Sequence, residues 1–238
     1  KTTIYGTNIY LGFIHVMSLE DKLGVSIEEN RRAEGPFRDM SDFVTRLNPG
    51  LEQMILLIRT GAFRFTGKNK GELLWEAHML MNKSKPEPMR RLFSPPARDF
   101  TLPGLEHCSL DDAYDEIELL GFPVSMSWFD MLVTSFRAEI KARDLNAYRG
   151  RMVKMVGHLV TIKYIKTVKK EWMNFGCFID HEGSFFDTTH FPQSLVNHPF
   201  KGAGTYLILG KVVEEFGYAS IEVEKMARLP VKPDKRYG

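Results

Sequence analysis

The pattern of apolar and polar residues is clearest in residues 151–229, where it predicts β-strands. Met152 to Tyr164 is one long apolar run rich in β-branched residues, and turn residues at Glu182-Gly183 and Phe216-Gly217 separate the later runs. Short runs divided by turns are typical of a small five-stranded barrel. Five strands are expected: one over 152–164, a second that ends at Asp180, a third through Phe185 and Phe186, a fourth over 205–213 and a fifth over 219–227. A loop is expected over 166–171 and a helical turn over 192–197.

Strand alternation also predicts which side chains leave the barrel core. Just after the first loop, Trp172 and Asn174 are expected to point outward, and Met173 and Phe175 inward. In the last strand, alternate residues of Ile221–Lys225 are expected to form one half-buried face.

The first 85 residues carry helical periodicity instead. Apolar positions at 51, 54, 55, 57 and 58 predict an amphipathic helix over 51–60, with Gly61 as its C-cap. A shorter helix is expected over 42–47 with Ser41 as its N-cap, and another over 70–81. The first 25 residues mix apolar and polar types without a clear period.

Prolines interrupt the chain between these two regions. Pro86, Pro88, Pro95, Pro96 and Pro103 exclude a continuous helix and indicate an extended connector. A helix is expected to resume over 109–119, with Ser109 as its N-cap and Asp111-Asp112 in its first turn, where the helix dipole favours negative charge. The sequence therefore predicts an α+β multidomain chain with a helical region over 1–85, a connector with short helices over 86–147, a barrel over 148–230 and a tail over 231–238.

Composition narrows the possible functions only modestly. The 238 residues are 43% hydrophobic and 26% charged, and the net charge is +2, so nucleic-acid binding would need local clusters of cations rather than bulk charge. Cys108 and Cys177 form neither a disulfide framework nor a zinc site, which indicates a reducing cytoplasm. No apolar stretch approaches the ~18 residues of a membrane span, and no signal peptide is visible. The chain begins at Lys1 rather than methionine, so we expect a segment of a longer protein.

A cluster of lysines accompanies the first loop of the expected barrel. Lys163, Lys166, Lys169 and Lys170 lie close together and would meet a phosphate backbone with several ammonium groups. Nearby rings would offer stacking faces, each worth roughly 1–3 kcal/mol per base. The candidate contact residues are Tyr164, Trp172, Asn174, Phe175, Phe185 and His190. The alternative is that the lysines merely solvate a hairpin and the rings fill the core.

The end of the helix over 51–60 is a second candidate nucleic-acid site. A helix that ends in glycine and turns tightly can present backbone amides to a phosphate of a duplex. Arg64, Lys68 and Lys70 flank the turn after Gly61. The alternative is an ordinary helix end with Phe63 in the core.

The connector holds a candidate protein-binding peptide, Met89-Arg90-Arg91-Leu92-Phe93. An apolar pair in an extended, proline-rich segment is a natural anchor, because proline lowers the entropy cost of docking. Met89, Leu92 and Phe93 would contact the partner, unless Leu92 and Phe93 tuck onto a neighbouring helix.

Catalytic candidates are poor. The seven histidines are scattered, without the spacing of a metal site, and no phosphate-binding glycine loop or nucleophile elbow is present. We therefore expect no catalytic residue, metal or cofactor within this chain.

Several segments, in order, resemble the C-terminal part of the bacterial replicative polymerase, the DNA polymerase III alpha subunit. The matching segments are Glu34-Gly35-Pro36-Phe37 with Ser41-Asp42-Phe43, Leu57 to Phe63, Leu119 to Ser125, Met155-Val156-Gly157, and Thr167, Met173, Phe175 and Asp180 to Gly183. The resemblance implies a helix-hairpin-helix region followed by an OB-fold, a five-stranded nucleic-acid-binding barrel.

The chain also departs from that family's pattern at three places. His15-Val16-Met17-Ser18 stands where the family's first hairpin has a glycine pair, and Lys169-Lys170-Glu171 replaces the usual glycine of the barrel's first loop. Met89 takes the place of the glutamine that begins the family's clamp-binding peptide. The replacement of that glycine by Lys169-Lys170-Glu171 predicts a loop that is still basic but less turn-like.

The resemblance implies a DNA-binding, non-catalytic segment of a polymerase that acts in DNA replication in the cytoplasm. The helical region would hold duplex product, the barrel would guide the single-stranded template, and the connector peptide would dock a sliding clamp. The full enzyme is a nucleotidyltransferase that uses Mg²⁺ in a palm domain, which this sequence lacks, so the segment alone is expected to be inactive. The alternatives are an RNA- or tRNA-binding OB-fold module and a protein-interaction adaptor.

Overall fold

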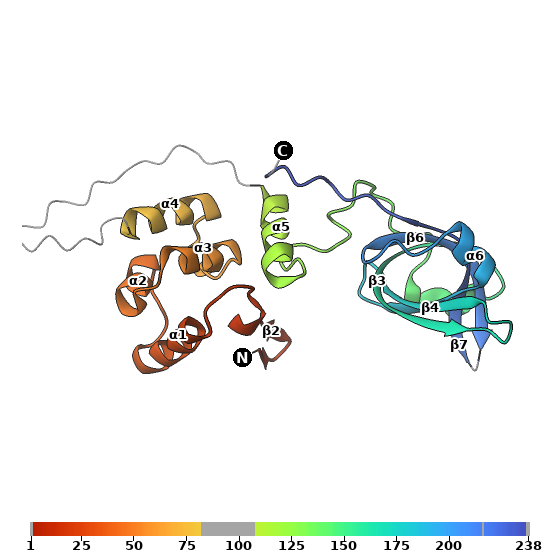
Figure 1. The fold of residues 1–238 in the computed structure, drawn as a ribbon, viewed down its shortest axis with the longest axis horizontal. Helices are drawn as coiled ribbons and strands as arrows, with labels where there is room; N and C mark the ends of the chain where they lie inside the picture. Colours follow the sequence, from red (N-terminus) through yellow and green to blue (C-terminus); the bar gives the residue numbers. More distant parts are fainter. Residues whose placement is uncertain (1, 82–107, 216, 237–238) are drawn as a thin grey trace, which may run out of the picture. The chain divides into compact units, whose positions relative to one another are not determined.

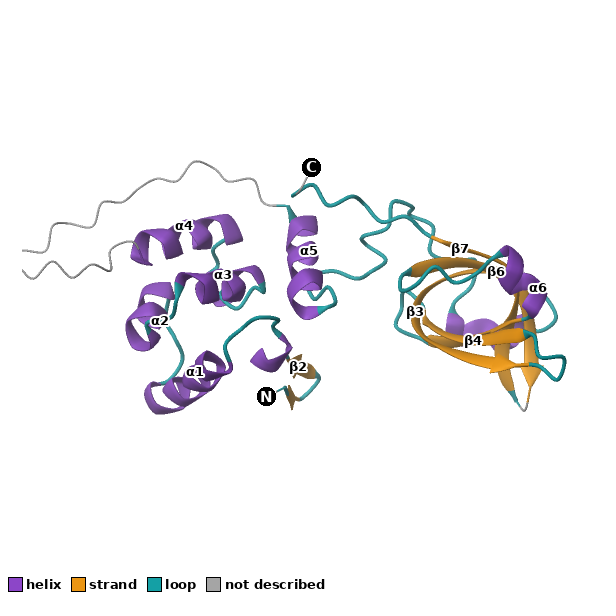
Figure 2. Ribbon diagram, viewed as in Figure 1, coloured by secondary structure: helices purple, strands orange, loops and turns teal. Residues whose placement is uncertain are grey.

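The computed structural model describes residues 2–81, 108–215 and 217–236 (Figure 1). The chain divides into two compact units, one formed by Lys1–Ser125 with Asp234–Gly238 and the other by Met126–Pro233. The first unit is mainly helical and the second holds most of the strands (Figure 2). No helix within the described ranges is both long and apolar enough to cross a lipid bilayer. The predicted α+β fold class is confirmed.

The helical unit packs its helices around one apolar core. Its elements are β1 (Thr3–Tyr5), β2 (Asn8–Tyr10), the 3-10 helix η1 (Phe13–His15), α1 (Asp21–Glu34), α2 (Met40–Leu47), α3 (Leu51–Arg59), the 3-10 helix η2 (Arg64–Thr66), α4 (Lys70–Met81) and α5 (Ser109–Leu120). The buried core comes from α1 to α4 and the turn after α3, with residues such as Met40, Phe43, Met54, Leu57, Phe63 and Leu73. The apolar stripe predicted over 51–60 therefore faces the core, because Met54, Leu57 and Ile58 are all buried.

Helix caps explain where the predicted boundaries moved. Helix α2 begins earlier than expected because Asp39, rather than Ser41, is the N-cap, with its Oδ1 accepting from the Asp42 amide at 2.8 Å. Helix α5 has Cys108 as its N-cap in place of Ser109. Helix α3 is followed at Gly61 by a left-handed residue with φ of 76°, as the sequence predicted.

Two buried carboxylates tie α5 to the rest of the helical unit. Asp115 pairs with Arg59 at 2.7 Å, with Lys70 at 3.2 Å and with Arg236. The fully buried Glu116 receives the backbone amides of Val124 and Ser125 and the guanidinium of Arg64. A buried carboxylate needs such partners to offset its loss of hydration.

The second unit is a closed barrel in the strand order β3-β4-β5-β7-β6 (Figure 1). The strands are β3 (Met152–Lys166), β4 (Trp172–Ile179), β5 (Phe185–His190), β6 (Thr205–Glu215) and β7 (Tyr218–Arg228), with the 3-10 helix η3 (Ala142–Tyr148) before them and α6 (Pro192–Asn197) between β5 and β6. All neighbouring strands are antiparallel except β5 and β7, which pair in parallel. The five strands and the helical turn that the sequence predicted are confirmed. Within the expected connector, residues 128–141 form turns and bridges and hold no helix.

Close packing inside the barrel fixes two of its glycines. A Cβ on Gly157 would lie 2.6 Å from Cζ of Phe186, and a Cβ on Gly176 would lie 2.7 Å from Cε2 of Phe178. The rings of Phe178 and Phe186 stack with centroids 5.6 Å apart in the core that these glycines line. The glycines therefore leave the space that the phenylalanine rings fill.

A β-bulge corrects the predicted pattern of the last strand. On β7, Lys225 pairs with Leu209 and Val223 pairs with Gly210, so Glu224 is the extra residue. The extra residue reverses the alternation beyond it. Ile221 and Val223 are buried as expected, but Lys225 is exposed and Met226 takes the inward position.

Candidate nucleic-acid interface

Strand register separates the predicted barrel residues into two groups. Directly opposed residues on neighbouring strands point to the same side of a sheet. Lys163 of β3 lies opposite Phe175 of β4, which lies opposite Thr189 of β5. Phe185 follows the same alternation at the far end of β5. This first group therefore lies on the outer face of the three strands, which we call the outer sheet face.

The second group lies at the end of the barrel near α6. Tyr164, Asn174 and His190 are opposed in one row across β3, β4 and β5, and Lys166 is opposed to Trp172 in the row beyond it. These side chains alternate with the outer group, so they share the side of the core residue Phe178. Because they lie near the ends of the strands, the rings of Tyr164 and Trp172 extend past the core. We call this place the α6 end.

All four rings of the predicted interface reach solvent. The exposed fractions are 61% for Tyr164, 56% for Trp172, 37% for Phe175 and 64% for Phe185. The idea that these rings fill the core is therefore wrong. The predicted orientations also need correction, because Phe175 is exposed whereas Asn174 is only 6% exposed. The reason is that Asn174, not Phe175, lies on the same inward side of β4 as Phe178. Trp172 also lies on that side, and it is exposed because it is the first residue of the strand.

Four lysines next to these rings are available to an anion. Lys163, Lys166, Lys169 and Lys170 are exposed, and none of them forms an ion pair with another described residue. The ammonium of Lys166 lies 4.8 Å from the centre of the Trp172 ring, a cation–π contact. Two carboxylates share this face: Asp187 of β5 is opposed to Cys177, and Glu222 of β7 is opposed to Thr189.

The loop between β3 and β4 turns tightly despite its lack of glycine. The Thr167 amide donates to the Glu171 carbonyl at 2.9 Å, and the Lys170 amide donates to the Thr167 carbonyl at 2.8 Å. Lys170 adopts φ of 65°, a left-handed conformation that usually favours glycine. The expectation of a less turn-like loop is therefore wrong. The loop keeps its turn at the cost of local strain and carries cations at its tip.

His190 occupies a buried position rather than a surface loop. The ring is 0% exposed, packs against Phe200 with centroids 4.6 Å apart, and bonds through Nε2 to Thr188 Oγ1 at 2.9 Å. Burial lowers the pKa of His190 to about 4, so the ring is neutral near pH 7. His190 can therefore act on a ligand only as a neutral hydrogen-bonding group.

The cations of the helical unit face carboxylates of the same unit. Lys68 pairs with Glu76 at 2.6 Å, and Lys70 pairs with Asp112 at 3.0 Å. Arg64 pairs with the buried Glu116. The predicted flanking cations are thus neutralised internally, in contrast to the lysines of the barrel.

The backbone amides after α3 are also engaged. The amide of Gly61 donates to the Ile58 carbonyl and that of Ala62 to the Leu57 carbonyl, both at 2.9 Å. These amides close the end of the helix, so they do not point at a phosphate as the sequence suggested. Phe63 is buried in the core, as the alternative interpretation expected.

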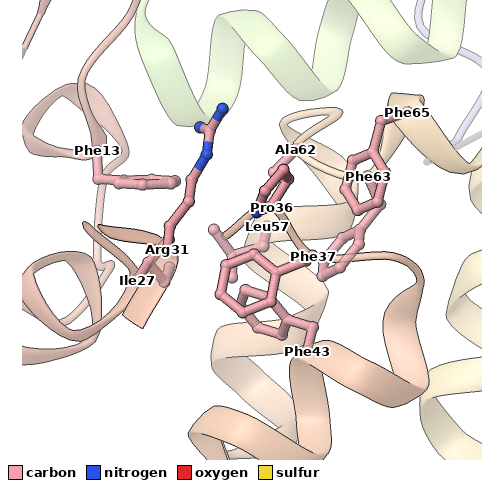
Figure 3. A pocket seen from close by; sticks show the side chains of 10 residues that line it. All are labelled: Phe13, Ile27, Arg31, Pro36, Phe37, Phe43, Leu57, Ala62, Phe63 and Phe65. Atoms are coloured by element: carbon pink, nitrogen blue, oxygen red, sulfur yellow. The ribbon is translucent and has the colours of Figure 1, made fainter. Parts of the chain in front are cut away.

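An apolar pocket of about 260 Å³ lies beside this helix end. Figure 3 shows the rings of Phe37, Phe43 and Phe63 gathered on one side and the side chain of Arg31 on the other. Phe43 and Phe63 meet edge to face with centroids 5.0 Å apart. The pocket is a seam of the helical core, with Arg31 as its charged lining residue.

The predicted protein-binding peptide lies outside the described residues. This applies to Met89, Leu92 and Phe93 and to the proline-rich connector around them.

Comparison with known proteins first indicates a class for the helical unit. Residues 1–73 match the model of a family described as the helix-hairpin-helix motif. A stretch of 72 residues is 35% identical to an error-prone DNA polymerase of Mycolicibacterium paratuberculosis. The match covers 30% of this chain and 7% of that polymerase, so the chain spans a small part of its relative.

Two solved structures are each similar to part of this chain. The single-stranded DNA binding protein of Thermus aquaticus is 14% identical, with a TM-score of 0.32, over 37% of this chain and 43% of that one. The second OB-fold domain of replication protein A from Methanococcus maripaludis is 12% identical, with a TM-score of 0.27, over 36% of this chain and 91% of that one. The strand order and closure described above, rather than these scores, define the OB-fold of the second unit.

Proposed function

We propose that the barrel binds single-stranded DNA across the outer sheet face, the loop between β3 and β4 and the adjoining α6 end. The observation that carries the proposal is the coincidence of solvent-exposed rings with unpaired ammonium groups. Trp172 and Phe185 are each more than half exposed, and Lys169 and Lys170 project from the adjoining loop. Rings stack on bases of any sequence, and ammonium groups neutralise the phosphates between them.

The proposal places this chain in a DNA polymerase of the replicative or error-prone type. The ordered segments that resemble the polymerase III alpha subunit support it, as do the helix-hairpin-helix match and the similarity to an error-prone DNA polymerase. In that role the barrel guides the template strand and the helical unit lies along the duplex product. The internal pairing of Arg64 and Lys70 favours the barrel as the main site of electrostatic attraction. Catalysis and its Mg²⁺ belong to the remainder of the polymerase.

Fluorescence anisotropy with a labelled single strand tests the barrel. The affinity should fall steeply with salt, and Lys169→Ala should reduce the slope of log K against log salt by roughly 0.7 to 1. Lys211→Ala is the matched control, because this exposed lysine of β6 pairs with Met152 at the opposite end of β3 from the loop. The control should leave the slope unchanged. A salt-independent signal, or equal effects of the two variants, contradicts the proposed site.

A competition experiment shows which kind of nucleic acid the barrel prefers. Unlabelled single-stranded DNA should displace the probe at lower concentration than tRNA does. If tRNA is the better competitor, the barrel is an RNA-binding module instead.

The sliding clamp is a separate proposed partner. It rests on the sequence Met89 to Phe93 alone, so its test must be independent of DNA. Pull-down with a sliding clamp should be lost when Leu92 and Phe93 are both replaced by alanine, while DNA binding persists. Retention of the clamp by this double variant contradicts clamp docking through the peptide.

A further inference from the structure

Three buried polar atoms at the α6 end lack a partner. Among the described residues, the buried side-chain atoms without a hydrogen bond are Oδ1 of Asn174, Nδ1 of His190 and Oγ of Ser194. Asn174 and His190 are directly opposed on β4 and β5, and Ser194 belongs to the helix that follows β5. Most buried polar atoms in folded proteins are paired, and each unpaired one is costly. Three at one end of the barrel indicate a place that a ligand completes.

The hydrogen-bond chain around His190 shows which of its atoms seeks a donor. The hydroxyl of Thr188 donates to the Gly176 carbonyl at 3.0 Å, so its oxygen accepts from Nε2 of His190. The proton of the neutral ring is then on Nε2, and Nδ1 is an acceptor. The Asn174 oxygen is an acceptor as well. Two neighbouring acceptors without donors call for a ligand that brings N–H groups.

A groove at the α6 end is lined by Asn174, one of these three residues. Its volume is about 380 Å³, within the range of small-ligand sites. Its lining residues are Tyr164, Trp172, Asn174, Leu195, Pro199 and Phe200. Two exposed rings at the rim, a carboxamide in the wall and Lys166 beside Trp172 match the parts of a nucleotide: a flat base, its polar edge and its phosphate.

We propose that this groove holds one base of the bound single strand, and that it favours a base with an exocyclic amino group. This proposal rests on the proposed binding of single-stranded DNA and adds a base preference to it. The base stacks on Trp172 or Tyr164, and its amino group donates to Asn174. Cytosine carries such a group, whereas thymine presents a carbonyl at the same position. Stacking on the outer sheet face supplies affinity without this preference.

Oligo-dC and oligo-dT strands of about 12 nucleotides test the preference, since an OB-fold covers about 4–16 nucleotides. The full chain should bind dC about fivefold more tightly than dT at the same salt concentration, the typical net effect of one hydrogen bond. Asn174→Leu should abolish this ratio while keeping affinity for dT. Phe185→Ala is the matched control on the outer sheet face, and should weaken both strands and leave the ratio unchanged.

A chemically modified DNA strand keeps the test decisive if Asn174→Leu fails to fold. A strand of pyrimidin-2-one nucleotides lacks only the 4-amino group of cytosine, and the unmodified protein should bind it as weakly as dT. Equal binding of dC, dT and this analogue overturns the base pocket and assigns the unpaired atoms to a buried water, while the proposed DNA binding stands. Absence of binding to any strand overturns the proposed function itself.

Discussion

Glu116 of α5 offers the sharpest test of how the helical unit is held together. Its side chain is fully buried, and Oε2 accepts from the Val124 amide at 2.6 Å, from the Ser125 amide at 2.7 Å and from the Ser125 hydroxyl at 3.0 Å. Its other oxygen pairs with Arg64. Glu116→Ala would leave two amides, a hydroxyl and a guanidinium without this acceptor.

The expected loss in the free energy of unfolding follows from the burial of Glu116. Breaking a buried charge pair costs about 3–5 kcal/mol. The Arg64 side chain is 51% exposed, so water replaces part of its lost pairing and we expect the lower end, about 3 kcal/mol. With a urea m value of about 2 kcal/mol/M, the unfolding midpoint should fall by roughly 1.5 M. Far-UV circular dichroism measures this transition because the helical unit contains most of the helices.

Glu118→Ala is the matched control on the same helix. Glu118 also pairs with an arginine, Arg59, at 2.5 Å, but its side chain is 45% exposed. Exposed pairs contribute about 0–1 kcal/mol, so this variant should shift the midpoint by less than about 0.5 M. Equal shifts for the two variants would refute the argument that burial sets the cost.

The remaining predictions concern the barrel. Gly157→Ala should destabilise it by about 1–3 kcal/mol in urea unfolding followed by tryptophan fluorescence, because the added Cβ would lie 2.6 Å from Phe186; an unchanged midpoint would contradict this packing. Burial lowers the pKa of His190 from 6.5 to about 4, so its contribution to stability is complete above about pH 6.5 and falls by roughly 3 kcal/mol as the pH drops to 4. In His190→Gln the barrel should still lose stability on acidification, but less than the unchanged protein, because burial also lowers the pKa of His158 to about 4; an unaltered pH profile would contradict the role of His190.

Local signals were enough to predict most elements of this chain. Helix α4 has the bounds that periodicity predicted, and the turn at Glu182-Gly183 and the helical turn at 192–197 lie where expected. These elements depend on neighbours in sequence: apolar spacing sets the buried side of a helix, and turn residues set the ends of strands. The cluster of lysines is likewise a local property, which explains why its position beside the barrel loop was predictable.

Contacts between residues far apart in the sequence decided the features that local signals did not predict. The bulge at Glu224 exists because β7 must stay paired with β6, and it turned Lys225 outward. Whether a cation is free depends on distant carboxylates, which pair with Arg64 and Lys70 but not with Lys169. The unpaired acceptors of Asn174 and His190 come together only through the register of β4 and β5. The sequence alone determined most of the elements and where the positive charge lies. Only the tertiary structure decided which side chains are buried, neutralised or left without a partner, because those outcomes depend on residues far apart in the chain.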